Sequence, residues 1–463
     1  MLIMAFLIVA VVFVYFLFKN FIKHKYNRLR AYGIPSGPKP SLSKLGNLLE
    51  FKSELNSISK KKEKIHHYSK TLYEWSKKYG SIWSYYEVFT PVVVLSDADL
   101  VCDIFLHENQ NILHRRSYPL GKRAHEKDAY LFLNKGARYE RVRKCMEKIL
   151  CKPSNVLECL VNQDSSFELI FEKCVQLQNF DIYQQVRHLS ANTMFESCFG
   201  VKINEFGLKN ERKENELKLI KGLSENFDVA FKKFQKPTIL RTLSLLFRKY
   251  DWFFYMVFKI QVKIFSLLKL NDFVDPLFWF NKNYIRKARM IKTEKFSFFK
   301  QFLNFTNISH LTDTYLTMNE AESNFLLIFF AGFETTSAAL AFTCHVLSHN
   351  KAECNKLINE FKSLNKNIEI EDLSRLKYLD CFVKEVLRMY PIANSMVARE
   401  SSVSDFKIKD NLTIPKGVTI VVDVLSIHYN QKLWGSYDVF EFHPERFFNL
   451  NIHPAAWLPF GLY

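Results

Sequence analysis

The sequence has 463 residues, of which 48% are hydrophobic and 24% charged. It is therefore long enough to bury a large core and too apolar to be generally disordered. Its formal net charge is +18, from 65 Lys and Arg against 47 Asp and Glu. Such a charge favours binding to an anionic membrane, to nucleic acid or to an acidic partner protein, and it does not distinguish among the three.

The N-terminus carries a long apolar run. Leu2 to Phe18 holds only apolar and aromatic residues, which is close to the shortest helix that crosses a bilayer. Basic residues follow the run and none precede it: Lys19, Lys23, Lys25, Arg28 and Arg30. By the positive-inside rule, the rest of the chain then lies in the cytosol. A cleaved signal peptide would need a basic leader and a small-residue cleavage site, which are absent here. We therefore expect residues 1–22 to be an uncleaved, single-pass transmembrane anchor.

A basic collar and a proline-rich hinge are expected at residues 23–40. The hinge reads Ile34-Pro35-Ser36-Gly37-Pro38-Lys39-Pro40. Prolines at this density exclude a helix and favour a short, stiff connector. Residues 41–463 would then form one globular body held at a membrane surface.

Strand patterns occur near both ends of this body. Ile82–Val88 and Val92–Leu95, on either side of Thr90-Pro91, predict a β-hairpin rich in aromatic and β-branched residues. A second strand region is expected at Phe406–Ile408 and Val418–Val424, linked by a turn at Ile414-Pro415-Lys416-Gly417. Most of the chain between them has helical spacing, with the clearest segments at Asp128–Leu150, Glu320–His349 and Leu376–Met389. The pattern predicts a mainly α (α+β) fold, a helical body with small β-sheets at its two ends.

Residues 250–280 are unusually rich in aromatic side chains. Lys259, Lys263 and Lys269 interrupt them, so a second membrane span is disfavoured. Two interpretations stay open for this stretch: ordinary helix burial, or a surface whose aromatic residues dip into the membrane interface.

The nine cysteines show neither CxxC pairs nor the spacing of a zinc site. Because the expected cytosolic compartment is reducing, disulfides are not expected either. Most of these cysteines are interpreted as small buried residues.

Ala331-Gly332-Phe333-Glu334-Thr335-Thr336 lies inside the long apolar helix pattern that starts near Glu320. An acid and two hydroxyls are unfavourable in mid-helix and costly if buried. Because the flanking segments are continuously apolar, we expect a buried acid–hydroxyl pair, which suits proton delivery to a bound reactant. Gly332 removes a side chain where a ligand or water could open the helix.

Two further motifs follow. Glu385-Val386-Leu387-Arg388 puts an acid and an arginine on one helix face, which alone would be interpreted as a weak surface ion pair. Pro444-Glu445-Arg446-Phe447 supplies another arginine in an aromatic loop. Together Glu385, Arg388 and Arg446 could form a buried triad, which is stabilising only if all its hydrogen bonds are satisfied.

The order and spacing of these motifs, ending in Trp457-Leu458-Pro459-Phe460-Gly461, resemble the cytochrome P450 superfamily over essentially the whole chain. The anchor and proline hinge resemble its microsomal animal members. The resemblance implies the cytochrome P450 fold, a heme b cofactor, and electrons from NADPH delivered by a flavoprotein reductase. It also implies a lipophilic small-molecule substrate and an endoplasmic reticulum location with the bulk of the chain in the cytosol.

The resemblance also assigns roles to residues. Glu334 and Thr335 match the catalytic acid–threonine pair, and Ala331 and Gly332 match the small residues of the oxygen pocket. Glu385, Arg388 and Arg446 match the structural triad. The residues matched to contacts with the heme propionates are Tyr139, Arg143 and Arg399, with Tyr139 standing where the family usually has Trp.

One departure from the family pattern concerns the iron. In the family, the Phe-Gly after this proline opens a loop whose cysteine binds the iron. Here Gly461 is followed only by Leu462 and Tyr463, and neither Cys344 nor Cys381 fits the ligand position. We therefore expect a catalytic domain that is incomplete at its C-terminus, with no metal ligand among these residues and no activity as written.

Two functions remain in view. The first is a membrane-bound monooxygenase that docks a flavoprotein reductase and contacts membrane lipid through its basic surface. The second is a heme-free, non-catalytic remnant or membrane-surface binding protein. Nucleic-acid binding has no supporting motif and conflicts with the expected anchor.

Overall fold

The structure, a computed structural model, describes residues 19–21, 23–41, 43–50, 67–107, 130–134, 136–152, 181–200, 296–306, 314–364, 370–393, 397–401, 404–409, 412–448 and 451–462, with a few positions between 253 and 285. These residues group into two compact units, Met1–Arg116 with Leu387–Tyr463, and Ser117–Val386. Residues 1–18 of the predicted anchor and most of residues 250–280 lie outside the described part.

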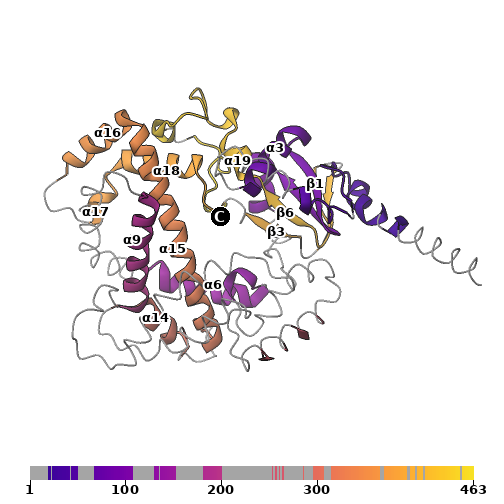
Figure 1. The fold of residues 1–463 in the computed structure, drawn as a ribbon, viewed down its shortest axis with the longest axis horizontal. Helices are drawn as coiled ribbons and strands as arrows, with labels where there is room; N and C mark the ends of the chain where they lie inside the picture. Colours follow the sequence, from indigo (N-terminus) through magenta and orange to yellow (C-terminus); the bar gives the residue numbers. More distant parts are fainter. Residues whose placement is uncertain are drawn as a thin grey trace, which may run out of the picture. The chain divides into compact units, whose positions relative to one another are not determined.

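The first unit combines segments from both ends of the chain (Figure 1). Its N-terminal elements are η1 (Arg28–Tyr32), α3 (His67–Tyr79), β1 (Ile82–Glu87), β2 (Thr90–Leu95), α4 (Ala98–Cys102) and η2 (Asp103–His107). Its C-terminal elements are β3 (Ala398–Glu400), β4 (Phe406–Lys409), β5 (Leu412–Ile414), β6 (Thr419–Val422), α19 (Val424–His428), η10 (Gln431–Leu433) and η11 (Pro444–Phe448).

The second unit is helical among its described residues. Its elements are η3 (Leu131–Leu133), α6 (Gly136–Leu150), α9 (Ile182–Phe199), α14 (Phe298–Asn304), α15 (Met318–His349), α16 (Lys351–Lys362) and α17 (Ile370–Leu373). The next helix, α18 (Lys377–Met389), begins in this unit, and its last turn belongs to the first. The predicted mainly α (α+β) class is confirmed.

The predicted hairpin is confirmed, with one shift. β1 and β2 are antiparallel, and Glu87 faces Thr90 across a turn at Val88 and Phe89. Val88 has a left-handed backbone, with φ of 57°, which a β-branched residue adopts only under strain. Pro91 therefore lies inside β2 rather than in the turn, opposite Tyr86.

Strands are present in both predicted segments, Phe406–Ile408 and Val418–Val424, but they belong to different sheets. β4 pairs with β5, whereas β6 joins the hairpin in a four-stranded sheet of order β1-β2-β6-β3. β6 runs parallel to β2, with Val92 opposite Thr419. All four residues of β6 are buried, which suits a central strand covered on both faces. Strands from the two ends of the chain thus share one sheet instead of forming separate ones.

The proline hinge is free of helix, as predicted, and it is hydrogen-bonded to the hairpin. The Gly37 N–H donates to the Ser84 carbonyl at 2.9 Å, and the Ser84 hydroxyl donates to the Pro35 carbonyl at 2.9 Å. The Asn47 amide donates to the Pro38 carbonyl at 3.1 Å. Residues 35–38 therefore form an edge contact of the sheet.

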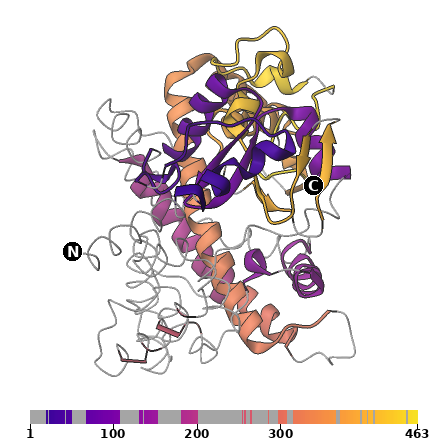
Figure 2. The same cartoon turned by 90° about the vertical axis from the view of Figure 1, so that its right-hand side faces the viewer.

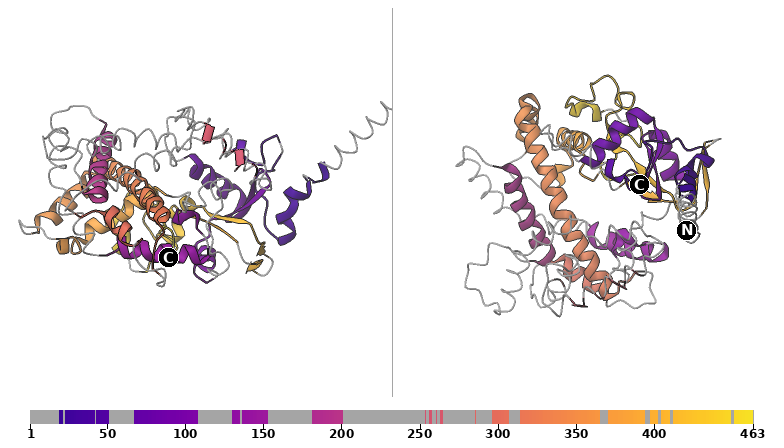
Figure 3. Two further views of the ribbon diagram at one scale, coloured as in Figure 1. Left: turned by 90° about the horizontal axis from the view of Figure 1, so that it is seen from below. Right: turned by 45° about the vertical axis from the view of Figure 1, so that its right-hand side comes forward.

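The core of the second unit is aromatic. Phe195 and Phe199 of α9 pack edge-on against Phe329 and Phe325 of α15, with ring centroids 5.0 and 5.2 Å apart. Figures 2 and 3 show α15 as one continuous helix, with α9 alongside it. Among the described helices, α15 alone is long and apolar enough to cross a membrane by length and composition. Its packing against α9 and α14 makes it the central helix of this unit.

Candidate functional site

The middle of α15 carries the predicted oxygen-activating residues. The Thr335 hydroxyl donates to the Ala331 carbonyl at 2.7 Å, and both residues are exposed. The expectation of a buried acid–hydroxyl pair is therefore wrong for Thr335 and Thr336, and the Glu334 side chain is 28% exposed. The reason is helical periodicity: Phe333 and Ser337 face the core one turn apart, and the residues between them point away from it.

Glu334 is turned toward α9. The Tyr183 hydroxyl donates to its carboxylate at 2.5 Å, and Nε of Arg187 lies 3.5 Å from its other oxygen. The Arg187 guanidinium also lies over the Phe333 ring, 4.9 Å from its centroid. Tyr183 and Arg187 are one turn apart on α9, so a single helix face holds the acid.

Gly332 permits close helix packing. A Cβ at this position would lie 2.8 Å from the sulfur of Met194 on α9. A larger residue here would therefore require the flexible end of the Met194 side chain to shift. Ala331 and Gly332 remain predicted oxygen-pocket residues, and the missing side chain of Gly332 also admits Met194.

Tyr139 and Arg143 form a pair on α6. The Arg143 guanidinium donates to the Tyr139 hydroxyl and to the Glu147 carboxylate, each at 2.7 Å. Hydrogen bonds to Glu147 and then to Tyr139 raise the pKa of Arg143 above its usual value. Arg143 therefore keeps its charge, which the Glu147 carboxylate partly balances.

In the first unit, Arg399 of β3 is half-buried. Its guanidinium donates to the Ala398 carbonyl at 3.0 Å and lies over the Phe105 ring, 5.6 Å from the centroid. Such a cation, partly shielded from water, suits a carboxylate partner.

Glu385, Arg388 and Arg446 are buried, with exposed fractions of 0%, 0% and 3%. Their burial excludes the surface ion pair that the spacing of Glu385 and Arg388 alone would suggest. Arg388 donates to the His428 carbonyl at 2.9 Å, and Arg446 donates to the Asp438 carbonyl at 2.9 Å. Both guanidiniums lie over the Trp434 ring, 5.5 and 6.0 Å from its centroid.

His428 is a buried residue that the motifs did not indicate. One ring nitrogen lies 2.8 Å from the Arg388 carbonyl, and the other lies 2.8 Å from the Leu458 N–H. Only the neutral ring with its proton on Nδ1 satisfies both partners. Burial lowers the pKa of His428 to about 3, which keeps the ring neutral. The imidazole thus ties the end of α18 to the segment that leads into Pro459-Phe460-Gly461.

Sequence analysis also did not identify four other residues that hold the site or its helix, and only two of them belong to a recognisable sequence pattern. Tyr183 and Arg187 have no local signature, because their partner Glu334 is distant in the chain. Thr317 and Glu320, by contrast, form a helix-start motif that is legible in the sequence, S/T-x-x-E, and the structure contains both of its hydrogen bonds.

No group of three or more His, Cys, Asp or Glu that could hold a metal ion occurs in the described part of the chain. Among the described cysteines, Cys145 is buried, and this burial raises its pKa to about 11. The pKa of Cys102 is also raised, chiefly by burial. Both thiols therefore disfavour the thiolate form that binds metals.

Together, the fold and these residues define a helical protein built on one long apolar helix that carries an acid and a threonine at its centre. The cytochrome P450 family profile matches residues 35–462. This chain belongs to the cytochrome P450 family.

Individual proteins that are similar to this chain belong to the same family. A Caenorhabditis elegans protein named cytochrome P450 cyp-13B1 is 24% identical over 427 residues, covering 84% of this chain and 78% of its own. Cytochrome P450 3A14 of Cavia porcellus is 26% identical and covers 93% of this chain and 80% of its own. Cytochrome P450 3A9 of Rattus norvegicus is 25% identical, covering 95% and 81%. Proteins of this family are heme-thiolate monooxygenases that take electrons from a redox partner and act on lipophilic substrates.

The described residues fit parts of a heme. The most apolar stretch of α15 is 33% buried within the protein. Each unit carries a half-buried guanidinium, Arg143 in the second and Arg399 in the first, and a guanidinium is a group that binds carboxylates.

Proposed function

We propose that this protein is a membrane-anchored monooxygenase that inserts one oxygen atom of O2 into a lipophilic substrate. Heme b would be the cofactor, and electrons would come from NADPH through a flavoprotein reductase. The observation that carries the proposal is the centre of α15, where Thr335 is exposed beside the half-buried Glu334 between two apolar stretches of the helix. When bound, heme supplies the oxygen chemistry of the family.

In this proposal, Thr335 and Glu334 handle protons. The Thr335 hydroxyl, now bonded to the Ala331 carbonyl at 2.7 Å, would turn to donate to a bound reactant. Glu334 would exchange protons with water through its exposed fraction, and Tyr183 and Arg187 would hold its carboxylate in place. Ala331 and Gly332 would keep this part of the helix free of bulk for oxygen.

Tyr139, Arg143 and Arg399 would bind the heme propionates. The Tyr139 hydroxyl and the Arg143 guanidinium lie 2.7 Å apart and are already ordered for a shared anionic ligand. Glu385, Arg388 and Arg446 would support the core structurally. Their complete burial supports a structural role rather than a catalytic one.

We also place the protein in the endoplasmic reticulum membrane, with residues 1–22 as a single-pass anchor and the bulk of the chain in the cytosol. The apolar run and the basic collar after it support this orientation. The net charge of +18 suits an acidic reductase and anionic lipid alike. Nucleic acid is not among the proposed partners.

The test is spectroscopic and kinetic. The protein would be expressed with its anchor, and heme content and the reduced, CO-bound difference spectrum would be recorded. NADPH consumption, hydrogen peroxide release and turnover of a fluorogenic benzyl-ether probe would follow with added reductase. In a protein that carries the family's ligand cysteine after Gly461, we expect a thiolate-type spectrum, and we expect Thr335→Ala and Glu334→Gln to lower probe turnover about 100-fold.

Thr343→Ala is the matched control. The Thr343 hydroxyl makes the same back-bond, to the Ala339 carbonyl at 2.9 Å, on the same helix. It should leave probe turnover unchanged. Absence of heme from folded protein would overturn the proposal and favour the second function, a heme-free binding protein at the membrane surface.

A further inference from the structure

A buried carboxylate stands at the start of α15. Glu320 is 1% exposed and belongs to the first turn of the helix. One of its oxygens accepts the Thr317 N–H at 2.9 Å, and the Thr317 hydroxyl accepts the Glu320 N–H at 3.3 Å. This capping box explains why an acid begins the helix, but it uses only part of the capacity of the carboxylate.

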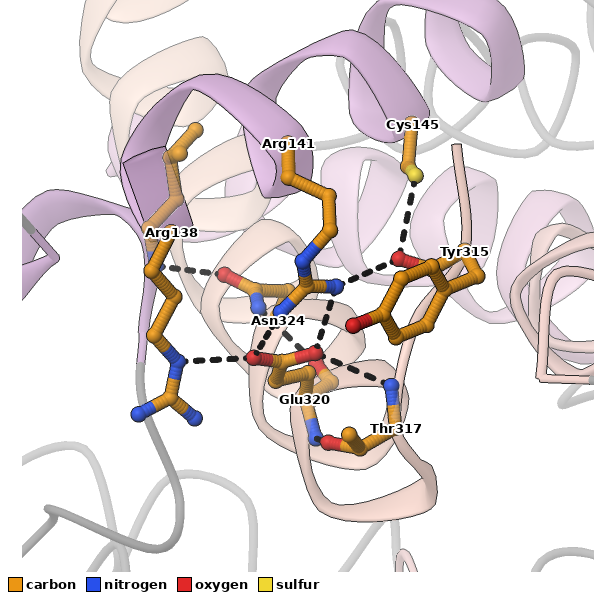
Figure 4. Close-up of polar contacts among 8 residues, drawn as sticks. Arg138, Arg141, Cys145, Tyr315, Thr317, Glu320 and Asn324 are labelled. Atoms are coloured by element: carbon orange, nitrogen blue, oxygen red, sulfur yellow. Dashed lines mark hydrogen bonds and ion pairs between the residues drawn. The ribbon is translucent and has the colours of Figure 1, made fainter. Parts of the chain in front are cut away.

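The remaining capacity is taken by two arginines of α6 (Figure 4). Arg141 donates to both carboxylate oxygens, at 2.7 and 3.0 Å, in the forked geometry of a bidentate pair. Nε of Arg138 donates to one of them at 2.7 Å. Glu320 is therefore the polar attachment of α6 to α15, beside the apolar packing of Val142, Met146 and Ile149 in the same core.

Neighbouring contacts fix the same orientation. Arg141 also donates to the Tyr315 carbonyl at 2.5 Å, and its guanidinium lies 4.3 Å from the centroid of the Tyr315 ring. Asn324 accepts the Leu131 N–H at 2.6 Å and so anchors the segment that precedes α6. The Cys145 thiol faces the Tyr315 carbonyl at 3.4 Å.

These contacts lie on one face of α6. Arg138, Arg141 and Cys145 are spaced i, i+3 and i+7, so they share a stripe that faces the start of α15. Tyr139 and Arg143 share a different stripe, about 150° around the helix at 100° per residue. Because a helix turns as a rigid body, the attachment at Glu320 sets the direction in which Tyr139 and Arg143 point.

We infer that Glu320 is a positioning residue for the Tyr139–Arg143 pair: clamped by Arg138 and Arg141, it fixes the rotation of α6 and so aims the pair at its anionic ligand. The inference rests on the proposed function, in which the pair binds a heme propionate. Glu320 itself would touch neither heme nor substrate.

A merely structural role for Glu320 makes a different prediction. If its carboxylate only strengthened the fold, its loss would accelerate heme release equally whether or not Arg143 was present. If it acts through the pair, its loss would add little once the pair is already broken, because contacting or coupled residues are not additive.

The experiment is a double-mutant cycle on the heme-loaded full chain. Heme dissociation would be timed by transfer to excess apomyoglobin for wild type, Glu320→Gln, Arg143→Leu and the double variant. We expect each single change to raise the dissociation rate about 10-fold, and the double variant to exceed the faster single variant by less than about twofold.

Two further variants serve as controls for the cycle. Asp372→Asn removes an acid–arginine pair from the same unit, since Asp372 bonds Arg375 at 3.0 Å, and should leave the rate unchanged. Arg138→Gln removes one hydrogen bond from Glu320 and replaces Glu320→Gln in the cycle if that variant does not fold.

The outcomes separate two failures. Additive effects in the cycle, or an unchanged rate in Glu320→Gln beside a raised rate in Arg143→Leu, would overturn the positioning role alone. An unchanged rate in Arg143→Leu, or no uptake of heme by the wild type, would overturn the propionate role of the pair and the inference with it.

Discussion

Glu320 and Glu334 lie on the same helix, α15, and differ in almost everything else. Glu320 is 1% exposed and accepts hydrogen bonds from two arginines and a backbone N–H. The Glu334 side chain is 28% exposed, with one hydrogen bond from Tyr183 and an arginine nitrogen at 3.5 Å. The difference shows that one helix can hold the same residue type in a fully bonded, buried setting and in a partly hydrated one.

The pKa of Glu320 reflects its position. Burial alone raises the pKa of its carboxyl group, but hydrogen bonds from Arg141, the Thr317 N–H and Arg138 outweigh burial and lower the pKa overall. A carboxylate so held stays charged and immobile. In the proposed function the proton-transfer role belongs instead to Glu334, whose side chain is partly exposed to water.

The largest expected effect comes from removing the attachment. Glu320→Ala should lower the free energy of unfolding by about 3 to 5 kcal/mol, because it leaves two guanidiniums without their partner and removes a helix cap. Urea unfolding followed by circular dichroism measures this. Asp380→Ala, which removes an exposed pair with Lys384, should cost no more than about 0.5 kcal/mol. Equal losses of unfolding free energy in Glu320→Ala and Asp380→Ala would show that the buried attachment contributes no more than an exposed ion pair.

Lowering the pH should destabilise the fold through protonation of Glu320. Because its folded pKa is lowered, its stabilisation is present above the unfolded pKa and is lost as pH falls through the folded value. Below about pH 4, wild type should therefore lose stability more steeply than Glu320→Gln, by at most about 1.4 kcal/mol per pH unit. Urea midpoints measured from pH 5 to pH 3 test this, and parallel curves for the two proteins would refute it.

A smaller effect is expected at the other acid. Glu334→Gln should change the free energy of unfolding by about 1 kcal/mol or less, because the carboxylate is partly hydrated and its arginine is distant. Its large effect should appear in turnover instead. A stability loss as great as that of Glu320→Ala would show that Glu334 is also a fixed attachment.

The smallest effect is expected for Tyr183→Phe. It removes one hydrogen bond to Glu334, which water can replace at that exposed edge, so about 0.5 kcal/mol should be lost. Combined with Glu334→Ala, which removes the acceptor, it should add almost nothing, because the two changes break the same bond. The double variant in the same urea assay decides this.

Local periodicity made much of the fold predictable. The hairpin at Ile82–Glu87 and Thr90–Leu95 and the helix Met318–His349 follow from spacing alone. The position of β6 beside β2 does not, because that pairing joins residues more than 300 positions apart. Likewise, the apolar composition around Thr335 could not tell which helix face was covered, so its exposure was predicted wrongly.

The candidate site divides in the same way. Family motifs locate Glu334, Thr335, Arg143 and Arg399, whereas the structure adds the partners that hold them. The arginines on Glu320 and the tyrosine on Glu334 come from α6 and α9, and no sequence pattern links those helices to α15.

The parallel pairing of β2 with β6 has a consequence for synthesis of the protein. β2 leaves the ribosome early, but Thr419–Val422 can add to its open edge only after Ser117–Val386 has been translated. The helical unit can therefore fold while the hairpin still exposes unpaired backbone groups, a template for unwanted strand addition. Nascent chains arrested before residue 419 should bind chaperones through that edge, and extension past residue 422 should release them.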